Sequence, residues 1–167
     1  MERFTTEEVV FIVDSGATAF LPFWTYIVES DIVAVLRNAG RRIYIHIPIS
    51  GGEMLTDTLL GFKTIAEMAT DRNLVVWINE YFGPVKRDEK TFDQMQVYRD
   101  HQEKVLASVG LPQLSPDTFG ENIRQMRERK MIFEEAIVSE EFHLVAKQRL
   151  SMVRRGIFEQ LERTPFA

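Results

Sequence analysis

Small and polar residues that could do chemistry follow three apolar runs of this sequence. They are DSG (residues 14–16) after VVFIV, SGG (50–52) after IYIHIPI, and NE (79–80) after LVVWI. In parallel α/β sheets, ligands bind at the carboxyl ends of the strands. An acid such as Asp14 is costly to bury there unless it meets a cation or hydrogen-bond donors. The sequence therefore predicts three candidate turns at one edge of a sheet.

Each turn also has a purely structural interpretation. Asp14 could cap the turn that follows it, as aspartate often does. Gly51 and Gly52 could expose backbone N–H groups to an anion at a helix N-terminus, or they could simply form a tight turn. The amide of Asn79 carries a donor and an acceptor suited to a base edge, although asparagine is also an ordinary turn residue. These alternatives stay open from the residues alone.

Apolar spacing predicts the elements that position these turns. We expect strands over residues 9–13, 43–49 and 74–78, and helices over 23–38, 55–69, 91–108, 117–130 and 139–163. Thr91 and Gln94 have the spacing of a capping box, and Pro116 suits a first helical position. The alternation predicts an α/β fold, with a mostly parallel sheet flanked by helices and a helical C-terminal third. Residues 110–116 read as an internal link, so one domain over 1–167 is expected.

Composition narrows the class of protein. The net charge is -5, which gives no global basic field for nucleic acid. There is no cysteine, so disulfides and thiolate metal sites are excluded. No apolar run approaches the ~20 residues that span a bilayer, and the first ten residues lack the order of a signal peptide. We expect a soluble, cytoplasmic protein.

The histidines and the last helix offer little chemistry. His46 lies within a predicted strand and is expected to be hydrogen-bonded in the core or behind a site. His101 and His143 lie on predicted helices, and no metal or hydrolase spacing links the three. The helix over 139–163 is amphipathic and locally basic, so it could meet a membrane surface or a partner. Packing against the sheet is the interpretation that we favour.

Six segments together resemble a known family. VVFIVDSGA resembles the Walker B and switch II segment of the ParA/MinD group of deviant P-loop ATPases. LVVWINEYFGP and GLPQLSPDTFGENI resemble their later strand and the following loop. The order of DSGATAFLP, SGGEMLTDTLLGF, VVWINEYFGP, FDQMQVY and RKMIFEEA is similar to TraL-type conjugative-transfer proteins of plasmids. The resemblance covers nearly the whole chain, and its specificity comes from the order of the motifs.

This resemblance implies a site and a setting. Asp14 would be the acid that holds Mg²⁺ through water, and Gly16 would belong to switch II. Asn79 would read adenine, and Pro112 would mark the backbone that lines the base. ATP and Mg²⁺ would be the cofactors of the complete family fold. The setting would be the bacterial cytoplasm, with other conjugative-transfer proteins as partners.

The sequence departs from the family at the phosphate loop. No lysine in it follows a glycine, so no GK[ST] motif exists. Phosphoryl transfer needs such a lysine with backbone donors, so we expect no ATP hydrolysis by this chain alone. The phosphate-loop strand would also lie beside residues 9–13, whose edge would otherwise be open. The missing segment could belong to a longer chain, a second copy could close the edge, or the flanking elements could rearrange to cover it, and we favour the first two. A homodimer is expected, and the alternative function is a non-catalytic dimeric scaffold of the transfer apparatus.

Overall fold

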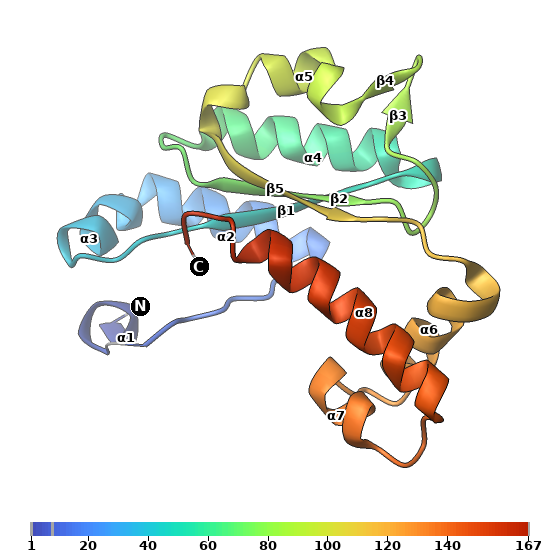
Figure 1. The fold of residues 1–167 in the computed structure, drawn as a ribbon. Coiled ribbons are helices and arrows are strands. Elements are labelled where there is room, and N and C mark those ends of the chain that lie inside the picture. The colour runs from blue at the N-terminus through green and yellow to red at the C-terminus, as the bar shows by residue number, and fades with distance from the viewer. Residues whose placement is uncertain (1, 8, 167) are drawn as a thin grey trace.

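Three parallel strands form the centre of the protein. The computed structural model describes residues 2–7 and 9–166. The strands are β1 (Ile45–Ser50), β2 (Leu74–Asn79) and β5 (Val105–Leu111), in the order β1-β2-β5 (Figure 1). All of their pairings are parallel, so the predicted α/β fold with a parallel sheet flanked by helices is confirmed.

Helices cover the sheet on both sides. Figure 1 shows α4 (Leu55–Met68) along one face and α8 (Leu144–Leu161) on the opposite side, next to β5. The remaining helices and the hairpin lie around this layer: α1 (Glu2–Thr6), α2 (Ala17–Glu29), α3 (Ile32–Asn38), β3 (Lys86–Arg87), β4 (Lys90–Thr91), α5 (Gln96–Arg99), α6 (Glu121–Glu128) and α7 (Phe133–Val138).

Two apolar clusters hold these elements together. The larger one joins alternate residues of β1 to the inward stripe of α4, and it includes Ile49 and Phe62, both fully buried. The smaller one lies among α6, α7 and α8 around Leu150, which is also fully buried. Side chains at every second strand position and every third or fourth helix position meet in this way.

The predicted strand over residues 9–13 is wrong. These residues form an irregular segment between α1 and α2, and Val10 and Ile12 are 89% and 90% exposed. Strand formation depends on hydrogen bonds to a neighbouring strand, and none of the described residues pairs with this segment. An apolar, β-branched run is therefore insufficient for a strand here.

The predicted helix over 91–108 is also wrong. Its capping box is present, since the side chain and backbone of Thr91 pair with those of Gln94, but the helical turns after it are short. The chain then extends into β5, where residues 105–111 pair with β2. The link expected over 110–116 accordingly begins inside a strand. Pairing with the sheet has overridden the local helical pattern.

The boundaries of the other predicted strands and of the helix at 55–69 agree more closely with the structure. The strands at 43–49 and 74–78 and the helix at 55–69 are confirmed to within two residues. Ser115 precedes the turn of π-helix Pro116–Gly120, with proline at its start as predicted. The helix expected over 139–163 begins only at Leu144, after the separate helix α7.

The helix expected over 23–38 is broken into α2 and α3. Asp31 lies at the break with φ 51°, in the left-handed region. Among the described residues no single helix is long and apolar enough to cross a membrane. The pair Ala19–Glu29 and Ile32–Asn38, bent by 66°, meets the length and composition criteria together. Trp24 and Ile27 of this pair are buried in the larger apolar cluster.

The two outer edges of the sheet differ. At β5, the Gln160 amide of α8 accepts from Gly110 N at 2.7 Å and donates to Gly110 O at 3.0 Å, so it takes the place of a neighbouring peptide. At β1, Ile45 N and Gly51 N donate toward the β2 side, so alternation turns the main chain of Pro48 outward. Proline has no N–H there, which makes this open edge a poorer template for another strand.

Candidate functional site

The carboxyl ends of the three strands meet at one edge. The register places Ser50 beside Asn79 and Asn79 beside Leu111. Glu80 N donates to Leu111 O at 2.9 Å, and this bond holds the end of β5 to the residue that follows β2. Pro112 follows directly and is exposed. The structure thus brings two of the predicted site residues, Asn79 and Pro112, to neighbouring strand ends.

Hydrogen bonds within the protein use part of the bonding capacity of the Asn79 side-chain amide. Its Oδ1 accepts from Tyr81 N at 3.1 Å, which stabilises the turn after β2, and its Nδ2 donates to Ser50 Oγ at a long 3.4 Å. An amide nitrogen has two hydrogens, so one donor stays available to a ligand. Asn79 therefore acts as a turn residue and still presents a donor at the edge of the sheet.

The glycine turn after β1 is closely packed. A Cβ on Gly51 would lie 1.9 Å from Gly83 O, and one on Gly52 would lie 2.4 Å from Phe82 O. Gly52 also has φ +66°, a conformation that favours glycine. Carbonyl oxygens that face the turn repel an anion, so the geometry favours the tight-turn interpretation. The glycines allow the loop after β2 to approach the end of β1.

Asp14 and Gly16 lie away from this edge. Asp14 is exposed in the irregular segment before α2. The carbonyl of Gly16 begins α2 by accepting from Ala19 N at 2.9 Å and Phe20 N at 3.1 Å, and a Cβ there would meet nothing within 4 Å. The prediction that DSG (14–16) shares the edge with SGG and NE is wrong, because the strand that would carry it does not form.

Thr58 is a positioning residue that the sequence did not single out. Its Oγ1 accepts from Ser50 N at 3.2 Å and lies 3.4 Å from Ser50 O, on the open side of β1. A side chain of α4 thus satisfies the main chain at the last residue of the strand. A threonine in the first turn of a helix after a strand is only a weak sequence signal.

The histidines are engaged elsewhere. His46 Nδ1 accepts from Trp77 Nε1 at 2.9 Å, so it is satisfied as predicted, although its side chain is exposed and not in the core. His143 caps α8 by accepting from Ala146 N at 3.2 Å, and the His101 ring packs near Phe62. These contacts involve none of the residues in the turns after β1 and β2, so no histidine is seen to pair with a nucleophile there.

The residues present do not fit a magnesium–ATP site. Within residues 2–7 and 9–166, no three His, Asp or Glu side chains are placed to hold a metal ion together. Asp14 lies outside the sheet, the glycine turn faces carbonyl oxygens, and no lysine follows a glycine. Of the residues named for this site, Asn79 and Pro112 lie at neighbouring strand ends.

The last helix packs against the protein. Phe142, Ala146 and Leu150 are buried with α6 and α7, as we favoured for this amphipathic segment. Arg154 Nε pairs with Glu134 Oε1 at 2.6 Å, and Arg155 lies 3.9 Å from Glu159. Its basic face is therefore partly neutralised by acids of the same chain.

The fold and the site define an α/β protein with a three-stranded parallel sheet and polar residues at the carboxyl ends of its strands. A protein named TraL from Escherichia coli is 34% identical over 159 residues, which cover 95% of this chain and 65% of that protein. A second Escherichia coli protein of that name is 31% identical over 163 residues, covering 97% and 68%. The chain therefore belongs to the TraL family. It spans about two thirds of the length of these relatives.

No family model matches the chain, and no solved structure matches it. The assignment to the ParA/MinD-like P-loop ATPases accordingly stays a prediction.

Proposed function

We propose that this protein assists plasmid conjugative transfer in the bacterial cytoplasm and contributes the base side of an adenine-nucleotide site. Membership of the TraL family supports the role in transfer. The observation that carries the nucleotide part is the placement of Asn79 beside Leu111, which puts Pro112 and a free amide hydrogen at one edge. Both positions match the adenine-facing motifs of the resemblance.

The proposal includes no catalysis by this chain alone. Asn79 and Pro112 would hold a base by a hydrogen bond and a backbone contact. No lysine of the sequence follows a glycine, and the described residues contain no cluster of three His, Asp or Glu side chains that could hold a metal ion. Binding should therefore be weak, should discriminate between bases and should not lead to turnover.

A binding assay tests the nucleotide part. Adenosine and cytidine carrying the same fluorophore would be titrated with the protein and followed by fluorescence anisotropy. We expect preference for adenosine and about a tenfold loss of affinity in Asn79→Ala, the size of one lost hydrogen bond. Asn38→Ala is the control, since Asn38 is exposed at the end of α3, far along the chain from this edge. Equal binding of both nucleosides would exclude a base site.

A mating assay tests the role in transfer. Deletion of the gene from its plasmid should lower the frequency of transfer to recipient cells, and a copy supplied in trans should restore it. Restoration by wild type and Asn38→Ala, but reduced restoration by Asn79→Ala, would link the edge of the sheet to transfer. An unchanged frequency after deletion would contradict the proposed role.

The second candidate is a non-catalytic homodimeric scaffold of the transfer apparatus. The exposed apolar segment over residues 9–13 favours it, because exposed apolar surface of this kind marks interaction sites. Light scattering should give the mass of a dimer for the wild type. Val10→Asp with Ile12→Asp should give a monomer, while Val138→Asp, an equally conspicuous exposed valine on α7, should not. A monomeric wild type would exclude this candidate.

A further inference from the structure

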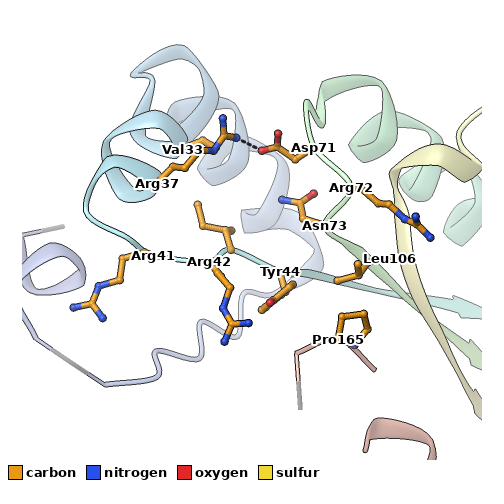
Figure 2. Close-up of a pocket in the computed structure, with 11 residues that line it drawn as sticks. Val33, Arg37, Arg41, Arg42, Tyr44, Asp71, Arg72, Asn73, Leu106 and Pro165 are labelled. Carbon is orange, nitrogen blue, oxygen red and sulfur yellow. Dashed lines mark hydrogen bonds and ion pairs between the residues drawn. The ribbon is translucent and has the colours of Figure 1, made fainter. Parts of the chain in front are cut away.

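Arginines gather at the opposite end of the sheet from Asn79 and Pro112. A cavity of about 300 Å³ lies there, beside the amino ends of β1 and β2 (Figure 2). Four arginines line it, three before β1 and one before β2: Arg37, Arg41, Arg42 and Arg72. Asp71 is the one acid among the lining residues. The charge of this cavity is thus strongly positive in a chain whose net charge is -5.

Among the residues that the structure describes, one of these arginines has an acidic partner. Arg37 pairs with Asp71, as the dashed line in Figure 2 shows. Arg72 Nε donates to Val105 O at 3.2 Å, which leaves the rest of its guanidinium group available. Arg42 is exposed and forms no hydrogen bond or ion pair with the described part of the chain. Figure 2 shows the guanidinium groups of these arginines pointing in different directions around the cavity, so their charges add to the local positive potential that attracts an anion without converging on one point.

Two polar atoms at the cavity are buried without a partner. One is Nε of Arg41, whose Nη2 donates to the carbonyl of Glu7. The other is Oδ1 of Asn73. Buried polar groups are normally hydrogen-bonded, so each such atom calls for an explanation. Nε of Arg41 is a donor and an asparagine amide can rotate to place its NH₂ group there, so both residues add unsatisfied donors to the wall of the cavity.

We propose that this arginine pocket binds a phosphate group. A guanidinium group offers planar, paired N–H donors that match phosphate oxygens, and it stays charged at every physiological pH. Tyr44, Leu106 and Pro165 form the less polar part of the lining, against which the body of a ligand can pack. Phosphate could come from a soluble small molecule or from a lipid headgroup. This inference is independent of the proposed base site, because it concerns other residues at the other end of the strands.

Calorimetric titration with inorganic pyrophosphate at low salt tests the pocket. Arg42→Gln removes a charge without removing a hydrogen bond or ion pair of the described residues, so folding is expected to be unaffected. We expect about a tenfold loss of affinity, the size of one charge-assisted hydrogen bond. Arg127→Gln is the matched control, an exposed arginine on α6 outside the pocket. Asp71→Asn should strengthen binding, since it removes the one acid and releases Arg37.

Vesicle sedimentation distinguishes the two sources of phosphate. Binding of pyrophosphate in solution, without sedimentation on phosphatidylglycerol vesicles, indicates a soluble ligand. Sedimentation on phosphatidylglycerol but not phosphatidylcholine vesicles, lost in Arg42→Gln and kept in Arg127→Gln, indicates a lipid headgroup. The proposal is overturned if neither probe binds, or if Arg42→Gln and Arg127→Gln behave alike.

Discussion

The indole Nε1 of Trp77 donates a hydrogen bond to Nδ1 of His46 at 2.9 Å, from β2 to β1. The register pairs Trp77 with Pro48 and His46 with Val75, so the bond runs diagonally across the two strands. The Phe166 ring lies 5.6 Å from the His46 ring, which brings the end of the chain onto the same patch. Since Nδ1 accepts, the imidazole is neutral with its proton on Nε2.

This bond predicts a pH dependence of stability. Partial burial lowers the pKa of His46 below its ordinary value of 6.5. The folded state then binds fewer protons than the unfolded state, so the contribution is fully present above pH 6.5. It falls as the pH drops from there toward the lowered pKa. We expect the thermal midpoint to fall between about pH 7.5 and 5.5, and to fall less in His46→Gln. Equal falls in both proteins would contradict this role.

Substitution of glycine by alanine is expected to have opposite effects on stability at Gly51 and at Gly61. Gly51→Ala puts a Cβ against the Gly83 carbonyl, so the free energy of unfolding should drop by about 1–3 kcal/mol. Gly61 lies inside α4, and a Cβ there meets nothing within 4 Å, so Gly61→Ala should raise it by about 1 kcal/mol. Urea denaturation measures both. Similar changes in the two variants would show that the loop after β2 does not press on the turn.

The side chain of Gln160 attaches α8 to β5, and its removal is expected to weaken this attachment. Gln160→Ala leaves Gly110 N and O of β5 without their partner, at an expected cost of about 1–3 kcal/mol. Gln148→Ala on the same helix is the control, because Gln148 is exposed and should change stability little. Hydrogen exchange should also quicken at Gly110 N in the first variant alone. Retained protection at Gly110 would mean that another group covers this edge.

The same leucine-to-alanine substitution at Leu150 and at Leu144 distinguishes the contribution of packing from that of helix propensity in α8. Leu150 is fully buried and Leu144 is 82% exposed. Leu150→Ala should therefore cost about 2–5 kcal/mol, while Leu144→Ala should change the free energy of unfolding by under ~0.5 kcal/mol. Chemical denaturation followed by circular dichroism measures both costs. Comparable losses would show that the smaller apolar cluster contributes little to stability.

The sequence determined the central strands and their turns well. The runs that became β1 and β2 and the stripe of α4 are bounded by strong local signals, such as SGG and Asn79, and these elements appear within two residues of prediction. The sequence did not predict that a strand brings Pro112 beside Asn79, because residues 91–108 were expected to form a helix, and only the family resemblance linked the two residues. It could not show that Gly51 and Gly52 are needed for close packing, since that depends on a loop thirty residues later.

Tertiary structure alone decided between two similar apolar runs. Residues 9–13 and 105–111 both contain valines suited to a strand, but only the second lies beside β2 and joins the sheet. It likewise gathered Arg37, Arg41, Arg42 and Arg72 around one cavity from separate segments. Strand formation and charge clustering depend on neighbours that are distant in the chain. A helix satisfies its backbone within one segment, whereas a strand forms only where another strand supplies the partners.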